Sequence, residues 1–220
     1  MSKLTNRDHI IGTDTEAQID GPAGKLELLY RCVEPAQTPT PVAIICHPHP
    51  LHGGTLRNKV VHMLAGGFNE LGAHSVRFNF RGVAKSAGKF DQGRGESEDL
   101  QAVCEWAQKT FPGSPLWLAG FSFGAYVAYR TLGHTEAQRL VLVAPPVTMF
   151  EFADTVEPGI PWMVIQGQED EVISADMVTD WVRQRPHAPA YFLHENTGHF
   201  FHGKLNLLKD SLKTGLSGLL

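Results

Sequence analysis

The chain alternates short apolar runs with longer amphipathic stretches, which predicts strands and helices in turn. Residues 42–46 and 116–119 are the clearest apolar runs, and both follow proline-containing segments, as is typical of buried strands. Residues 60–71 instead carry apolar side chains every three or four positions, which indicates a helix. We expect strands at 15–20, 25–33, 42–46, 75–80, 116–119, 139–144, 162–166 and 191–194, and helices at 60–71, 97–110, 123–132, 175–185 and 203–220.

This order of elements predicts an α/β fold, with a mostly parallel central sheet and helices on both faces. The first two strands are joined by Gly21-Pro22-Ala23-Gly24, which favours a hairpin. The sequence has no internal repeat or low-complexity segment, so we expect a single domain over residues 1–220. In such sheets, reactive residues gather in the loops at the carboxyl ends of the strands.

The most informative of these loops is Gly120-Phe121-Ser122-Phe123-Gly124, between a predicted strand and a predicted helix. A strand that turns sharply into a helix brings the two backbones close together, and glycines on either side permit this. The hydroxyl of Ser122 then points out of the turn as a candidate nucleophile. The N–H of Phe123 lies at the helix N-terminus, where backbone donors are unpaired and negative charge is favoured.

A serine hydroxyl needs a base within hydrogen-bond reach, and that base needs an acid to orient it. Asp170 and His199 follow two later predicted strands, in the chain order Ser, Asp, His that this type of elbow uses. We therefore predict Ser122 as nucleophile, His199 as general base and Asp170 as the acid that orients it. Protonation of the base then lowers activity on acidification.

Neighbouring residues offer alternatives to this assignment. Glu169 or Glu171 can replace Asp170 as the acid, and Asp170 can instead cap the helix that begins near Ser174. His194 and His202 are the rivals of His199. The glycine before His199 and its place in a loop favour His199 over both.

With these residues in place, the chain resembles the α/β-hydrolase family over nearly its whole length. The resemblance rests on the serine elbow, on Gly167-Gln-Glu-Asp170, on Gly198-His199 and on His47-Pro48-His49. It is nearest to the small members with almost no lid, which include carboxylesterases, thioesterases and dienelactone-hydrolase-like enzymes. The resemblance implies hydrolysis of a small ester, thioester or amide through an acyl-enzyme, with no cofactor or metal.

The resemblance also implies an oxyanion hole formed by the N–H of Phe123 and a second N–H after Cys46. Pro48 and Pro50 have no N–H, so His49 or Leu51 must supply it, and we predict His49. Each such donor is typically worth about 3 kcal/mol.

Two departures from the family pattern limit what the resemblance implies. Asn79 and Ala84 stand where the family often has Asp and Gly, so we assign no catalytic role to residues 79–84. Residues 147–159 stand where larger members carry a helical lid, and so short a segment favours an open site for a small substrate. Met149, Phe150 and Phe152 either line an acyl pocket there or belong to the core.

Two other classes of function remain alternatives. One is a non-catalytic ligand-binding or receptor protein on the same scaffold, which would have no need of all three residues of the triad. The other is a metal-dependent hydrolase that uses His47, His49 and His52, although the Asp that usually follows such a motif is absent. The elbow serine favours a serine hydrolase over both.

Composition restricts the setting. The formal net charge is −4 and no basic patch or long apolar run is present, so neither a nucleic acid nor a membrane is an expected partner. Cys32, Cys46 and Cys104 are odd in number, and we expect reduced, mostly buried thiols in a cytoplasmic protein. The sequence leaves the acyl group, the leaving group and the oligomeric state open.

Overall fold

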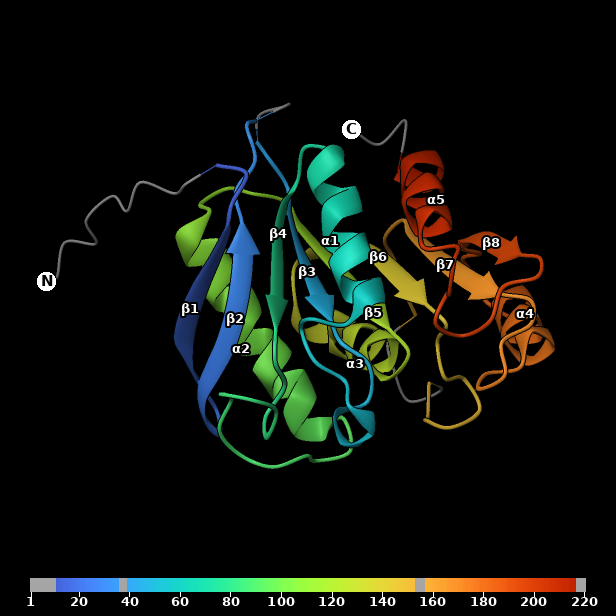
Figure 1. Cartoon of the computed structure of the whole chain (residues 1–220), viewed down its shortest axis with the longest axis horizontal. Coiled ribbons are helices and arrows are strands. Elements are labelled where there is room, and N and C mark those ends of the chain that lie inside the picture. Colours follow the sequence, from blue (N-terminus) through green and yellow to red (C-terminus); the bar gives the residue numbers. More distant parts are fainter. Residues whose placement is uncertain (1–10, 36–38, 153–156, 217–220) are drawn as a thin grey trace, which may run out of the picture.

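The computed structural model describes residues 11–35, 39–152 and 157–216. Within these ranges, eight strands form one sheet in the order β1-β2-β4-β3-β5-β6-β7-β8 (Figure 1). The strands are β1 (Asp14–Gly21), β2 (Gly24–Arg31), β3 (Val42–Cys46), β4 (His74–Phe78), β5 (Leu116–Phe121), β6 (Ala137–Val143), β7 (Trp162–Gly167) and β8 (Ala190–His194). The β1–β2 and β2–β4 pairs are antiparallel, and all the other pairs are parallel.

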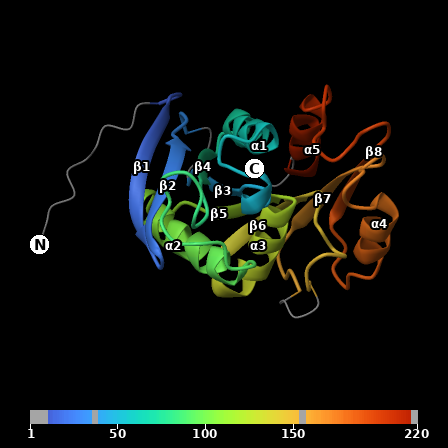
Figure 2. The same cartoon turned by 60° about the horizontal axis from the view of Figure 1, so that its bottom comes forward.

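Helices cover both faces of this sheet (Figure 2). On one face lie α1 (Lys59–Glu70) and α5 (Asn206–Leu216), whose buried side chains share a core with one side of the sheet. On the other face lie α2 (Arg94–Thr110), α3 (Phe123–Thr131) and α4 (Ala175–Arg183). This arrangement confirms the predicted fold class.

Strand β3 shows why its residues form a central strand. Val42 and Ile44 point into the core beneath α2 and α3, whereas Ala43 and Ile45 point into the core beneath α1 and α5. All five residues of the strand are buried. A strand covered on both faces reads as a continuous apolar run, which is the pattern that predicted it.

The strand register brings the loops of the candidate site to one edge of the sheet. Cys46 at the end of β3 pairs with Gly120 near the end of β5, and Phe121 pairs with Val143 at the end of β6. Gly167 at the end of β7 pairs with His194 at the end of β8. The loops after these strands therefore leave the sheet side by side, as expected for a parallel sheet.

Several element ends differ from the predicted ones. Helix α2 begins at Arg94 rather than at Ser97, because the carboxylate of Glu96 accepts backbone N–H groups at the helix start. Helix α4 ends at Arg183, two residues early, because Pro186 disfavours helical backbone at the residue before it. Helix α5 begins at Asn206, since residues 202–205 form turns, and residues 217–220 lie outside the described ranges.

The three cysteines are buried and free, as predicted. Burial raises the pKa of Cys32 to about 11 and that of Cys104 to about 12, and it raises the pKa of Cys46 well above its usual value. None of the thiols is thus a nucleophile at neutral pH. Among the helices of the described ranges, none has the length and apolar character to cross a bilayer. Cytoplasmic placement stays a prediction.

Candidate active site

Ser122 occupies the tip of the turn between β5 and α3. Its backbone has φ 54° and ψ −120°, a region that residues other than glycine rarely adopt. Hydrogen bonds on both sides hold it there: the Ser122 N–H donates to the Val143 carbonyl at 2.8 Å, and its carbonyl accepts from Ala125 at 2.8 Å. Such a conformation costs about 1–3 kcal/mol and persists only where the surroundings enforce it.

Gly120 and Gly124 allow the close approach that this turn requires. A Cβ on Gly120 would lie 2.1 Å from the carbonyl oxygen of Gly124. A Cβ on Gly124 would lie 2.4 Å from the carbonyl oxygen of Cys46 and 2.6 Å from that of His47. The start of α3 therefore packs directly on the backbone that leaves β3, which places the loop after His47 beside Ser122.

We expect Gly124→Ala to damage the protein because its Cβ meets rigid backbone. Overpacking of this kind costs about 1–3 kcal/mol, which for a chain of this size lowers the Tm by roughly 2–4 °C per kcal/mol. Gly159→Ala is the matched control, since a Cβ there meets nothing within 4 Å. Thermal unfolding of both variants is the measurement. Equal Tm values for the two variants would contradict the close approach.

Asp170 and His199 form a buried pair. His199 Nδ1 lies 2.8 Å from Asp170 Oδ2, and their side chains are 3% and 0% exposed. An ionised carboxylate only accepts hydrogen bonds, so the proton of a neutral His199 ring sits on Nδ1 and Nε2 is left as a base. The ring packs against Phe121, the residue before Ser122, with centroids 5.0 Å apart.

Asp170 is held by three further hydrogen bonds. Its Oδ1 accepts from the N–H groups of Val172 and Ile173 at 2.9 and 2.7 Å. Its Oδ2 also accepts from Gln166 Nε2 at 2.9 Å. Burial raises the pKa of Asp170, but the hydrogen bonds and the imidazole outweigh this effect and hold the pKa below its usual value. The carboxylate is therefore ionised wherever the enzyme is folded and near neutral pH.

The neighbouring acids and histidines have other contacts. Glu171 Oε2 accepts the backbone N–H of His199 at 3.0 Å, so it orders the loop rather than the ring. His194 Nε2 lies 2.8 Å from the hydroxyl of Ser211 on α5. Ser174, not Asp170, caps α4. Two further rivals lie aside: the Glu169 N–H donates to the Thr197 carbonyl, and the His202 ring lies beside Phe200.

The loop after β3 lies next to the elbow. The His49 ring is 5.1 Å from the Phe123 ring, measured between centroids. The N–H of Leu51 donates to His49 Nδ1 at 3.2 Å, so it is already engaged. This contact favours His49 over Leu51 as the source of a second oxyanion donor beside the N–H of Phe123.

His47 has a structural role that the sequence did not indicate. Its Nδ1 lies 2.6 Å from the carbonyl oxygen of Pro48, and its Nε2 accepts the N–H of Phe80 at 3.1 Å. Burial lowers the pKa of His47 to about 4, so the ring is neutral. Because both ring nitrogens are engaged, the metal-site alternative loses its first ligand. Across the described ranges, no three His, Cys, Asp or Glu side chains are grouped to hold a metal.

Comparison with known proteins agrees with this geometry. A crystal structure of a lidless α/β serine hydrolase from Xanthomonas campestris is 42% identical, with a TM-score of 0.90, and the alignment covers 97% of this chain and 98% of that one. The chain belongs to the α/β-hydrolase family. An α/β serine hydrolase homologue from Coxiella burnetii is 40% identical, with a TM-score of 0.85 over 96% of this hydrolase and 99% of that chain.

Two further comparisons extend the family assignment without naming a substrate. An uncharacterized protein of Rickettsia prowazekii is 35% identical over 195 residues, which cover 84% of this hydrolase and 81% of that protein. A family model described as serine aminopeptidase, S33, matches residues 49–155. The matched part includes Ser122 but ends before Asp170 and His199.

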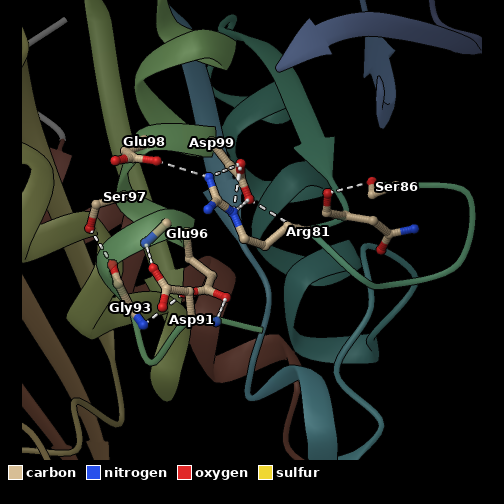
Figure 3. A network of polar contacts seen from close by, with 10 residues as sticks. Arg81, Ser86, Asp91, Gly93, Glu96, Ser97, Glu98 and Asp99 are labelled. Atoms are coloured by element: carbon tan, nitrogen blue, oxygen red, sulfur yellow. Dashed lines mark hydrogen bonds and ion pairs between the residues drawn. The ribbon is translucent and has the colours of Figure 1, made fainter. Parts of the chain in front are cut away.

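A buried polar network orders the loop between β4 and α2 of the hydrolase (Figure 3). Arg81 forms a paired contact with Asp99, from Nη2 to Oδ1 at 2.8 Å and from Nε to Oδ2 at 3.1 Å. Glu96 accepts the N–H groups of Asp91 and Gly93 at 2.8 and 2.7 Å. Carboxylates on the buried face of α2 were the sequence signal for this network. It fixes the loop that carries Phe90.

Phe90 belongs to an aromatic wall beside the elbow, which we define as Phe90, Phe123 and Phe150. The Phe123 ring lies 5.6 Å from Phe90 and 5.4 Å from Phe150. Phe150 is half-buried, whereas Phe152 is 4% exposed and packs in the core against Trp181. Met149 is 57% exposed. Of the three residues with an open role, only Phe150 therefore reaches the wall.

Proposed function

We propose that this α/β hydrolase cleaves a small ester or thioester through an acyl-enzyme formed on Ser122. The observation that carries the proposal is the buried Asp170–His199 pair, with its Nδ1 to Oδ2 distance of 2.8 Å, packed against the residue before a strained serine. This combination of residues supports general-base activation of a hydroxyl.

The chemistry follows from the roles of the three residues. Ser122 Oγ attacks the carbonyl carbon as its proton passes to His199 Nε2, and the carbonyl oxygen becomes an oxyanion. The N–H groups of Phe123 and His49 stabilise that oxyanion. His199 then gives the proton to the departing alcohol or thiol. A water attacks the acyl-enzyme in the same way, releasing the acid and restoring Ser122.

The surroundings of Ser122 support a small substrate. The described residues of the segment between β6 and β7 contain no helix, so no helical lid covers the elbow from these residues. The aromatic wall offers an apolar surface next to the nucleophile, which suits a short acyl chain. An acyl chain that extends past the wall reaches solvent and gains no further burial.

A series of p-nitrophenyl esters and matching acyl thioesters from two to twelve carbons tests the proposal. We expect turnover of the short members, with kcat/KM for the longest at least about tenfold lower because added methylenes gain no contact. A burst of the leaving group before steady turnover would indicate the acyl-enzyme. Folded protein that turns over no member of either series would contradict the proposal and favour a ligand-binding role.

A further inference from the structure

The side chain of His49 holds the loop that follows β3. Its Nδ1 accepts the N–H of Leu51 at 3.2 Å, and its carbonyl oxygen accepts the N–H groups of His52 and Gly54, both at 3.1 Å. Pro48 and Pro50 have fixed φ angles and donate no hydrogen bond. The Leu51 N–H is thus a donor in this turn that needs an acceptor, and the imidazole supplies it.

Aromatic rings fix the orientation of this imidazole. The His49 ring stacks on His52, with centroids 4.4 Å apart and planes 20° apart. It also lies 4.8 Å from Phe90 and 5.1 Å from Phe123, on the two neighbouring segments of the site. The ring therefore connects the oxyanion loop to the elbow helix and to the aromatic wall.

We propose that the neutral imidazole of His49 is a positioning group for the oxyanion hole, and that its protonation switches hydrolysis off independently of the catalytic base. This inference rests on the proposed function. A protonated ring carries a hydrogen on Nδ1, so two donors would face each other where Leu51 now donates. The turn must then open, and the backbone N–H of His49 moves with it.

The surroundings keep the ring neutral near pH 7. Burial and the nearby His52 both lower the pKa of His49. His52, on the same loop, is the titratable group that faces the ring. The segment before α2 and helix α3 present the uncharged rings of Phe90 and Phe123 to it. The switch therefore acts on the acid side of neutrality.

Two substitutions separate positioning from packing. Asn at position 49 can accept the Leu51 N–H through Oδ1 but cannot be protonated, whereas Leu preserves bulk and offers no acceptor. We expect His49→Leu to lower kcat/KM at pH 8 by up to about 100-fold, the effect of a small misplacement at a reacting centre. We expect His49→Asn to recover most of that loss. His134→Asn, at an exposed position on the short helix Leu132–His134, is the control for removing a histidine.

The pH profile supplies the readout that a purely structural role would not move. In the wild type, two protonations each abolish turnover, so log kcat/KM against pH approaches a slope of two at its acid end. Hydrogen bonds hold the pKa of Asp170 below its usual value, so Asp170 does not add to this limb. In His49→Asn the slope approaches one. An unchanged slope, or equal activity of the Asn and Leu variants, would overturn the proposal.

Labelling by a fluorophosphonate at pH 8 distinguishes this failure from failure of the proposed function. If Ser122 is labelled in the wild type, the serine chemistry stands and the pH profiles test His49 alone. If the wild type is not labelled, the proposed function fails and this inference fails with it. Circular dichroism at each pH of the profile confirms that the protein measured is folded.

Discussion

Ser122→Ala is expected to lower kcat for the best ester by about 10⁶-fold, which is the scale seen when a triad nucleophile is removed. The described chain offers no ready replacement, because burial raises the pKa of each cysteine and keeps its thiol protonated. Activity of about 10³–10⁴ over the uncatalysed rate should remain, since the oxyanion donors and substrate binding survive. Steady-state kinetics on the ester panel measures both quantities.

Ser174→Ala is the matched control for this variant. Ser174 is exposed and caps α4, so its loss costs about 1 kcal/mol of stability without touching the site. Alanine at position 122 inherits the same strained backbone, so Ser122→Ala should unfold close to the wild-type Tm. A Ser122→Ala protein that keeps more than about a hundredth of wild-type kcat would assign the reaction to another nucleophile.

Asp170→Asn is expected to lower kcat by about 10⁴-fold while leaving the fold intact. The reason lies in the four hydrogen bonds of the carboxylate. The N–H groups of Val172 and Ile173 retain the amide oxygen, which turns the new NH₂ group toward His199 Nδ1. Nδ1 must then be an acceptor, so the proton moves to Nε2 and the ring can no longer act as a base.

Glu171→Gln is the control for this assignment, with kcat/KM as the measurement. A glutamine oxygen can still accept the backbone N–H of His199, so we expect only a small loss. Glu169→Gln should behave like the wild type, since the recorded contact of Glu169 is made by its backbone N–H. An active Asp170→Asn beside an inactive Glu169→Gln or Glu171→Gln would show that the acid has been assigned wrongly.

The sequence predicted the sheet and the placement of the candidate site because both depend on local patterns. The apolar run of β3 ends where predicted, at the point where His47 and Pro48 begin a loop. Ser122, Asp170 and His199 were found because each follows a strand. In a parallel sheet, position along the chain predicts which edge a loop occupies.

The polar contacts that order the site could not be predicted in the same way. Arg81 and Asp99 are 18 residues apart, and Asn79 donates to a Glu27 carboxylate 52 residues away. No local periodicity encodes such pairs. The role of His47 was missed for the same reason, because its partner Phe80 lies on another strand's loop. Its pattern resembled that of a metal ligand only along the chain.

The most direct test of the account is the intact mass of the protein after exposure to a fluorophosphonate, with Ser122→Ala beside the wild type. We expect one adduct on the wild type and none on the variant, because only a serine activated by His199 attacks the phosphorus. A wild-type protein that is folded and gains no adduct would contradict the central claim. So would an adduct of equal yield on Ser122→Ala.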